Sequence, residues 1–301
     1  MQDSPLVSVI IPVYNDPIRL RRCLNNLLGQ TYKTFEVIVV DNGSDRFEDI
    51  QAVVEAYPWK LLFVEPTPGS YAARNAGIAH ARGDILAFTD ADCLPVADWL
   101  ARGVAQMKAH PRCGLIGGCI QIHTQNKQHP VELYESVMAL SQQKFVEQDH
   151  FAATANMFTR PDVFEEVGLF DTALKSSGDV EWGRRVFTAG YAQIYAEDVR
   201  ISHPARQTFA QLAKQASRHA GGFYQVRCQQ QASWLARNTA FLKLLGFHLM
   251  PPVQFALEMA RHPQLRTPSD VMKVVLTLGF VRAVIVKSLL KLRFGGVAER
   301  V

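Results

Sequence analysis

The sequence predicts an α/β fold with a central, mostly parallel sheet, followed by a helical appendage at the C-terminus. Three observations support this prediction. Short continuous apolar runs alternate with amphipathic helical patterns in the first 120 residues, which is typical of buried parallel strands joined by crossover helices. Acidic and turn-forming residues collect where these runs end. After residue 230 the alternation is gone and the chain becomes apolar and basic.

Five apolar runs of strand length are predicted to form the sheet. They span residues 7–13, 36–41, 60–64, 84–89 and 114–122. Three helical patterns lie among them. These are residues 17–28, with leucines on one face; residues 71–81, with Ser70 as a candidate N-cap; and a helix from Pro95 towards Lys108. An open sheet of this kind binds its ligand outside the carboxyl ends of its strands.

From residue 131 the strict alternation stops. We expect a helix over residues 131–148, an amphipathic helix that Gly178 precedes, a strand at 191–199 leading to His203, and a long helix from about 209 to 230. Asp179 then lies in the first turn of its helix, where the helix dipole favours an anion. The predicted domains are residues 1–230 and a basic, apolar helical tail over residues 231–301.

The overall composition is that of a globular protein, with 301 residues, 48% hydrophobic and 20% charged, and a net charge of +4. The five cysteines form no CxxC pair, which favours a reduced cytoplasmic environment. The first residues lack the basic segment and cleavage site of a signal peptide. No GxGxxG pattern follows the first predicted strand, which argues against a dehydrogenase.

Acidic residues are concentrated at three predicted strand ends, in the segments PVYND, VDNGSD and TDADC. Joining helices to strands would require only Gly, Pro or Asn at these turns. If the strand continued through TDADC, alternation would point Asp90 and Asp92 to the same side. Two carboxylates that close are costly unless a cation or hydrogen-bond donors lie between them. The pattern therefore indicates a cation site.

Five segments together resemble glycosyltransferase family 2, the inverting, nucleotide-sugar-dependent enzymes of the GT-A fold. They are VSVIIPVYN, VDNGSD, ARNAGIAHARGDILAFTDAD, NMFTRPDVFEEVGLFD and GDVEWGRRV, and the similarity covers roughly residues 6–225. The resemblance implies a UDP-sugar donor and an acceptor hydroxyl, in the synthesis of cell-surface polysaccharide or glycolipid. One departure is that many members carry a Glu-Asp pair where this chain has Gly178 and Asp179.

The resemblance also implies a divalent cation, Mg²⁺ or Mn²⁺, at the DxD-like segment Asp90-Ala91-Asp92. Asp92 would bind the metal, and Asp90 would contact the ribose or the water shell of the metal. His203 is similar to a histidine that some relatives supply as a second metal ligand.

Further residues correspond to the donor site of the family. Asp41 matches the position that accepts a hydrogen bond from the imide N–H of uracil, with Pro12 and Tyr14 lining the nucleotide slot. Arg74 lies among small residues, from which an arginine can reach a diphosphate or pair with an aspartate.

On the acceptor side, Asp179 is the candidate general base, which takes the proton of the attacking hydroxyl. Glu181, two residues further along the helix, is a candidate acceptor contact. Gln215 and Arg218 resemble the QxxR[W/Y] segment of processive relatives, although His219 replaces the aromatic residue. An ordinary amphipathic helix explains this segment equally well.

The tail carries ten basic and three acidic residues from Ala232 onward, so the rest of the chain is slightly acidic. Lys243, Arg282 and Lys287 interrupt its apolar runs, which are therefore too short for uncharged membrane spans. We expect interfacial helices on an anionic membrane at its cytoplasmic face, and a lipid-linked acceptor. The alternative is a helical subdomain packed on the catalytic domain. Nucleic-acid binding is not expected, because the basic residues are not interleaved with stacking positions.

Two other functions remain as alternatives. A nucleotidyltransferase would bind the same sugar nucleotides, but it needs a glycine-rich loop after the first strand, where this chain has PVYND. A non-catalytic sugar-nucleotide-binding protein would retain the fold without turnover. The absence of Glu before Asp179 is the one feature that favours it.

Overall fold

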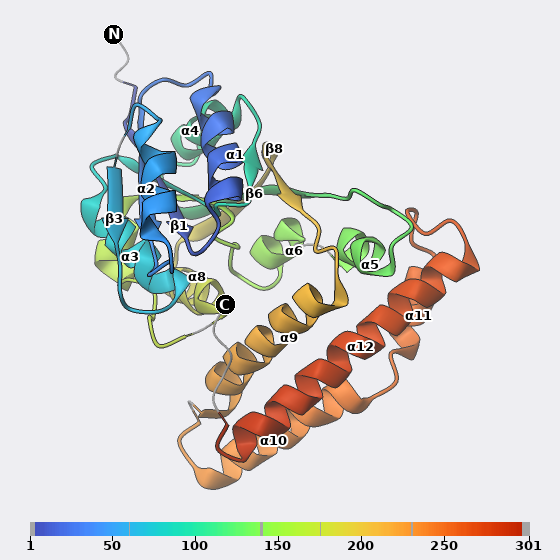
Figure 1. The fold of residues 1–301 in the computed structure, drawn as a ribbon. Helices are drawn as coiled ribbons and strands as arrows, with labels where there is room; N and C mark the ends of the chain where they lie inside the picture. Colours follow the sequence, from blue (N-terminus) through green and yellow to red (C-terminus); the bar gives the residue numbers. More distant parts are fainter. Residues whose placement is uncertain (1–3, 60, 139–140, 175, 230, 297–301) are drawn as a thin grey trace. The chain divides into compact units, whose positions relative to one another are not determined.

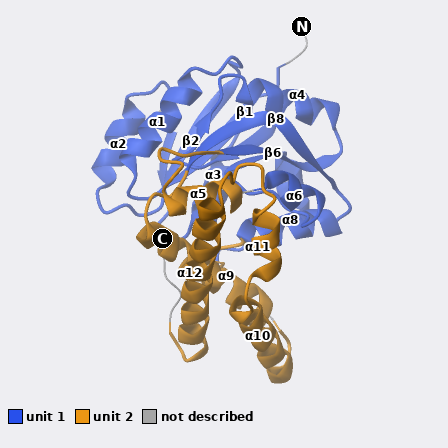
Figure 2. Ribbon diagram, turned by 90° about the vertical axis from the view of Figure 1, so that its right-hand side faces the viewer, with its two compact units in different colours: residues 1–121, 140–173, 178–204 blue, residues 122–139, 174–177, 205–301 orange. Residues whose placement is uncertain are grey.

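The computed structural model describes residues 4–59, 61–138, 141–174, 176–229 and 231–296. These residues form two compact units, which Figure 2 colours separately. The first comprises residues 1–121, 140–173 and 178–204, and the second residues 122–139, 174–177 and 205–301. The predicted domain boundary at 230 divides the chain differently, since residues 205–230 and two short earlier segments lie in the second unit. Gln230 itself is outside the described residues, as are Glu299 and Arg300 of the tail.

The predicted fold class is confirmed. The described residues contain an eight-stranded sheet in the order β3-β2-β1-β4-β7-β6-β8-β5. Strands β1, β3, β6 and β8 of this sheet are labelled in Figure 1. Four parallel strands form one half: β1 (Val7–Val13), β2 (Phe35–Asp41), β3 (Leu61–Val64) and β4 (Ile85–Thr89). The other half contains β7 (Asn156–Thr159), β6 (Cys113–His123), β8 (Ala192–Pro204) and β5 (Leu94–Pro95), with β7 antiparallel to both β4 and β6. Lys60, the predicted start of the third strand, is outside the described residues.

Helices cover both faces of the sheet because alternate strand residues are apolar on opposite sides. Val7, Val9 and Ile11 of β1 pack in one core with α1 (Pro17–Leu28), α2 (Phe47–Glu55) and α4 (Trp99–Ala109). Ile10 packs in the opposite core with residues of α3 (Ser70–His80), α7 (Pro161–Val167) and α8 (Gly178–Thr188). The two cores pack on opposite faces of the sheet and fix its position. The carboxyl ends of its parallel strands lie at one edge.

Three predicted boundaries differ from the structure. Gly69, with φ of +134°, is the N-cap of α3, and Ser70 is the first helical residue. Pro95 does not begin a helix, because Leu94 and Pro95 form β5, which pairs antiparallel to Ser202 and Ile201 of β8. The helix expected over residues 131–148 is two helices, α5 (Pro130–Met138) and α6 (Gln142–Glu147), and residues 139 and 140 between them are outside the described residues.

The strand predicted at 191–199 is longer than expected. β8 continues to Pro204, so that His203 lies on the strand and not in the following loop. β8 lies between β6 and β5 in the sheet, and both neighbours supply backbone partners beyond Val199. The long helix after it, α9 (Phe209–Tyr224), begins with a capping box formed by Thr208 and Gln211 and continues into a π-helical turn at Gln225–Gln229.

The second unit is built on the long helix α12 (Pro268–Arg293), which packs along α9 and α5. α10 (Trp234–Leu249) and α11 (Val253–Met259) complete it. Leu212 of α9 and Leu278 of α12 are buried in one cluster, and Ala220 of α9, Phe241 of α10 and Leu289 of α12 are buried in another. The second unit therefore has an apolar core of its own, to which α9 contributes as well as the tail.

Among the described residues, no single helix has both the length and the apolar composition of a membrane span. The consecutive helices α10 and α11, bent by 46° relative to each other, meet these two criteria when taken together.

Candidate functional site

Three of the predicted site segments meet at the carboxyl edge of the sheet. β1, β2 and β4 are adjacent and parallel, and Val13 at the end of β1 is paired with Asp41 at the end of β2. Pro12 and Tyr14 are half-buried beside this end of the sheet. Asp90 directly follows β4. The shared edge is the consequence of parallel pairing, which was the basis of the prediction.

Asp41 is almost completely buried, with 1% of its surface exposed. Its Oδ2 atom accepts hydrogen bonds from the backbone N–H groups of Gly43 (3.1 Å) and Ser44 (3.0 Å), which fixes the turn after β2. Its Oδ1 atom is buried and has no hydrogen-bond partner among the described residues. A buried carboxylate oxygen without a donor is costly, so this atom is suited to accept one N–H from a ligand.

Asp90 forms an ion pair with Arg74 of α3, with Nη2 2.5 Å from Oδ1. The arginine side chain is only 5% exposed and its guanidinium lies over the ring of Tyr71, 5.6 Å from the centroid. Its buried Nε has no hydrogen-bond partner among the described residues. Of the two fates considered for Arg74, the structure shows the pairing with an aspartate, and the buried Nε–H is available to a further acceptor.

The side chains of Asp90 and Asp92 point in different directions, because β4 ends at Thr89 and the residues after it form a turn. The backbone N–H of Cys93 donates to the carbonyl of Asp90 at 3.0 Å, which closes this turn. The strand alternation expected to align the two aspartates therefore does not apply. Asp92 Oδ1 lies 3.6 Å from Nε2 of His203, while Asp90 is held by Arg74.

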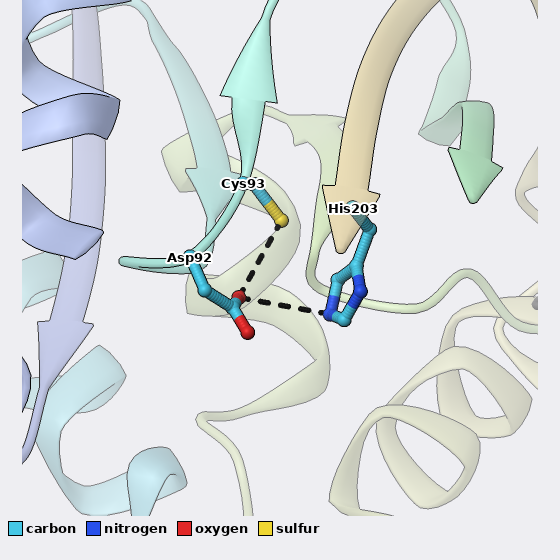
Figure 3. A group of neighbouring side chains, drawn as sticks. All are labelled: Asp92, Cys93 and His203. Atoms are coloured by element: carbon cyan, nitrogen blue, oxygen red, sulfur yellow. Dashed lines mark hydrogen bonds and ion pairs between the residues drawn. The ribbon is translucent and has the colours of Figure 1, made fainter. Parts of the chain in front are cut away.

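Asp92, Cys93 and His203 form the cluster drawn in Figure 3, with one ligand atom of each within 4.8 Å of the others. His203 Nδ1 is 2.9 Å from the carbonyl oxygen of Pro204, which can only accept. In the neutral form of the ring, this contact places the proton on Nδ1 and the Nε2 lone pair on the side of the Asp92 carboxylate. Two acceptors that face each other in this way fit a cation between them, and a backbone carbonyl orienting the ring is typical of histidine ligands.

Cys93 is fully buried, with its Sγ 3.9 Å from Asp92 Oδ1. Burial, followed by the nearby Asp90 and Asp92 carboxylates, raises the pKa of the thiol above its ordinary value. The thiol is therefore protonated at neutral pH in the absence of a cation.

Asp179 lies in the first turn of α8, as predicted. Its Oδ1 atom accepts a hydrogen bond from the hydroxyl of Tyr71 (3.1 Å) and one from the backbone N–H of Val180 (3.0 Å). Burial raises the pKa of the carboxyl above its usual range, although the Arg74 guanidinium and the Tyr71 hydroxyl oppose this. A carboxylate whose proton affinity has been increased is a better base near neutral pH.

Tyr71 explains why the chain has glycine before Asp179. A Cβ added at Gly178 would lie 2.7 Å from an atom of the Tyr71 ring, so any larger residue displaces this ring. The family's glutamate and the tyrosine therefore exclude each other at this point. In this chain the side chain that contacts Asp179 and lowers its pKa is the phenol of Tyr71 from α3. It takes the place of a carboxylate from the preceding residue.

The other acceptor candidates have internal partners. The Glu181 carboxylate accepts from Arg185 Nε at 2.7 Å, and Arg185 also donates to the carbonyl of Leu169 at 2.7 Å. Glu181 thus helps to hold the loop before α8.

Gln215 and Arg218 lie on α9 of the second unit. With its amide in the favoured orientation, Gln215 accepts from Arg206 at 3.1 Å, and Arg206 donates to Glu135 at 2.7 Å. Burial and the charges of Arg218 and Arg206 lower the pKa of His219 to about 3, so the residue that replaces the family's aromatic is neutral.

Sequence reasoning missed two groups of this site. Tyr71 was seen only as the first residue of a helix, and the signal that could have revealed its role is the glycine at 178, which leaves room for another side chain. Cys93 was set aside because the five cysteines show no metal-binding spacing. Its ligand partners come from different parts of the chain, which spacing along the sequence does not reveal.

Comparisons with known proteins show the family of this chain. The model of the family described as glycosyl transferase family 2 matches residues 8–168. Glycosyltransferase AglE of Haloferax volcanii is 38% identical over 278 residues, which cover 90% of this chain and 90% of AglE.

Two solved structures have a similar fold. A mannosyltransferase from Pyrobaculum calidifontis, in complex with GDP-Man and Mn²⁺, is similar with a TM-score of 0.63 and 22% identity, covering 96% of this chain and 87% of its own. GalNAc-T7 with UDP, GalNAc and Mn²⁺ has a TM-score of 0.55 and 18% identity, covering 67% and 43%.

Proposed function

Because the chain belongs to glycosyl transferase family 2 and is therefore a glycosyltransferase, we propose that it uses a UDP-sugar and a divalent cation. In this proposal a hexose or related sugar is transferred to an acceptor hydroxyl with inversion, in the synthesis of a cell-surface polysaccharide or glycolipid. The observation that carries the proposal is the pair of facing acceptors, Asp92 Oδ1 and His203 Nε2, 3.6 Å apart. Both solved neighbours described above contain Mn²⁺ and a nucleotide, which supports this interpretation.

The choice of uracil rests on Asp41. One of its oxygens is occupied by two backbone donors, which leaves one buried acceptor. Uracil offers a single imide N–H at the matching edge, whereas guanine offers two adjacent donors that suit a carboxylate with both oxygens free. Pro12 and Tyr14, at the end of β1, would line the slot for the base, and Asp90 would contact the ribose.

In the proposed mechanism, Arg74 positions the donor, because its buried Nε is available to a phosphate oxygen while its Nη2 is held by Asp90. Asp179 takes the proton of the acceptor hydroxyl as that oxygen attacks the anomeric carbon, and the leaving diphosphate departs from the opposite side. A divalent cation held by Asp92 and His203 would neutralise the charge that develops on the diphosphate. Inversion follows from this single displacement.

Calorimetric titration with UDP tests the proposal. We expect micromolar binding of UDP with Mn²⁺ or Mg²⁺ present and much weaker binding in EDTA. GDP should bind more weakly, because its second donor has no acceptor at Asp41. dTDP has the same imide N–H but carries a 5-methyl group and lacks the 2′-hydroxyl, so it reports how closely the site recognises the rest of the nucleoside. Tighter binding of GDP would contradict the assignment of Asp41, and absence of binding by all three nucleotides would contradict a nucleotide-sugar donor.

We further propose that the second unit binds the cytoplasmic face of an anionic membrane, where a lipid-linked acceptor would be available. Apolar side chains are exposed along α10 and α11 and in the turn between them. They are Trp234, Leu235, Leu242, Phe247, Leu249, Met250, Val253 and Leu257. Arg237 and Lys243 on α10 add positive charge beside these groups. Exposed apolar residues flanked by basic ones are typical of helices that lie in a lipid interface.

Co-sedimentation with vesicles tests this membrane proposal. The protein should bind vesicles containing anionic lipid more tightly than zwitterionic vesicles, and high salt should weaken the binding. Phe247→Ser should reduce binding, because it removes an exposed apolar ring from α10 (55% exposed). Phe187→Ser in the first unit, where the residue is 47% exposed, is the matched control and should have no effect. Equal losses in the two variants would contradict a specific role of α10.

A further inference from the structure

The cation cluster contains a sulfur atom next to the two ligands assigned above. Leu94 pairs with Ser202 and Pro95 with Ile201 in the antiparallel pair β5–β8. Continuing this register by one residue places Cys93 opposite His203, and residues opposite each other in an antiparallel pair point to the same side. The sheet itself therefore holds the thiol and the imidazole together.

We propose that the Cys93 thiolate is a third ligand of this centre and makes it selective for Zn²⁺ over Mn²⁺ and Mg²⁺. This inference rests on the proposed role of Asp92 and His203 as metal ligands. Mg²⁺ and Mn²⁺ prefer oxygen, whereas thiolate and imidazole favour Zn²⁺ and softer ions. One carboxylate, one imidazole and one thiolate leave the fourth position of a tetrahedral zinc ion open, which is the arrangement of a site that also takes an exogenous ligand.

The atomic positions are compatible with such an ion. Zinc binds sulfur at about 2.3 Å and nitrogen or carboxylate oxygen at about 2.0–2.2 Å, so its tetrahedral ligand atoms lie roughly 3.3–3.7 Å apart. The Asp92–His203 separation of 3.6 Å falls in this range, and the Asp92–Cys93 separation of 3.9 Å is slightly longer. The three ligand atoms all lie within 4.8 Å of one another, so a small side-chain rotation completes the set. On binding, the thiol releases its proton to solvent.

The competing explanation is that Cys93 is a small apolar residue of the core, where it is buried in the same cluster as Cys23 of α1. Cys23 is equally buried but does not belong to the ligand group. Cys93→Ala and Cys23→Ala therefore delete the same atom from the same core, and only the first removes a ligand. Comparing their melting temperatures shows whether the core has been disturbed to the same extent.

Metal titrations of the intact protein decide between the two explanations. With Cd²⁺, the wild type and Cys23→Ala should develop a thiolate-to-metal absorption band that saturates at one equivalent, and Cys93→Ala should lack it. In calorimetric competition, Zn²⁺ should displace Mn²⁺ from the wild type, and Cys93→Ala should lose about 10- to 100-fold in Zn²⁺ affinity while Mn²⁺ affinity is retained.

Two other outcomes overturn the inference in distinguishable ways. An undiminished Cd²⁺ band and unchanged Zn²⁺ affinity in Cys93→Ala, with Mn²⁺ still bound, would reject the sulfur ligand and leave the metal site of the proposed function intact. Failure of the wild type to bind any of the three cations would reject the metal site itself.

Discussion

Asp179→Asn is expected to reduce the rate of sugar transfer by about 10²- to 10⁴-fold, the usual contribution of a general base. The reason is that asparagine keeps the shape of the side chain and can still accept from the Tyr71 hydroxyl, but it cannot take a proton. Binding of UDP should be unchanged, because Asp179 is assigned no contact with the nucleotide. Steady-state transfer assays and UDP calorimetry on the same preparation separate the two effects.

Asp162→Asn is the matched control for this variant. Asp162 lies in the first turn of α7 and accepts from the N–H of Val163 at 2.9 Å, much as Asp179 accepts from Val180 at 3.0 Å. The Asp162→Asn variant should transfer sugar at the wild-type rate. Retention of more than about a tenth of wild-type activity in Asp179→Asn would be incompatible with the role of general base.

The raised pKa of Asp179 gives the pH dependence a definite sign. The base acts only when ionised, so the rate should fall as the pH drops through the pKa of this carboxyl, above the usual range of an aspartate. Tyr71→Phe removes a hydrogen bond that lowers this pKa, and the acidic limb of the profile should therefore move to higher pH.

The pH dependence of folding stability follows from the same raised pKa of Asp179. The folded pKa lies above the unfolded one, so stability is lost as the pH rises from the unfolded value through the folded value. Asp179→Asn should consequently melt at a higher temperature than the wild type at neutral pH, and this advantage should vanish in acid.

Asp92→Ala is expected to abolish metal-dependent binding of UDP, with a loss of more than about 100-fold in Mn²⁺ affinity. The substitution removes the carboxylate that faces His203 Nε2 and leaves the cluster without the oxygen ligand that Mn²⁺ prefers. In calorimetric titrations with Mn²⁺ present, the variant should bind UDP as weakly as the wild type does in EDTA. His203→Ala should also weaken the binding of Mn²⁺.

The control for Asp92→Ala is Asp198→Ala, which removes a partly exposed carboxylate from the strand that carries His203. Asp198 pairs with Arg102, and its side chain is 40% exposed, so its loss should not affect UDP binding. If Asp92→Ala binds UDP with unchanged metal dependence, Asp92 is not a metal ligand and the cation site must be elsewhere.

The bounds of β1 and α1 were predicted correctly because their signals are local. β1 is a continuous apolar run, and α1 carries leucines at helical spacing with a proline at its start. The helix start predicted at Pro95 and the predicted end of β8 were wrong for the opposite reason. A two-residue strand at Leu94–Pro95 forms only because Ser202 and Ile201 pair with it, and nothing in the local sequence announces that partner.

What the sequence determined by itself was the fold class, the family and the edge of the sheet where the polar residues gather, since these depend on periodicity and on parallel strands ending together. Only the tertiary structure decided how those residues are paired. Asp90 and Asp92 are one residue apart, yet a turn after Thr89 gives the first to Arg74 of α3 and the second to His203 of β8. Tyr71 in turn occupies the space that Gly178 leaves, and its hydroxyl donates to Asp179. These partners are far apart in the chain, and packing, which depends on the shape and volume of side chains from several elements at once, brings them together.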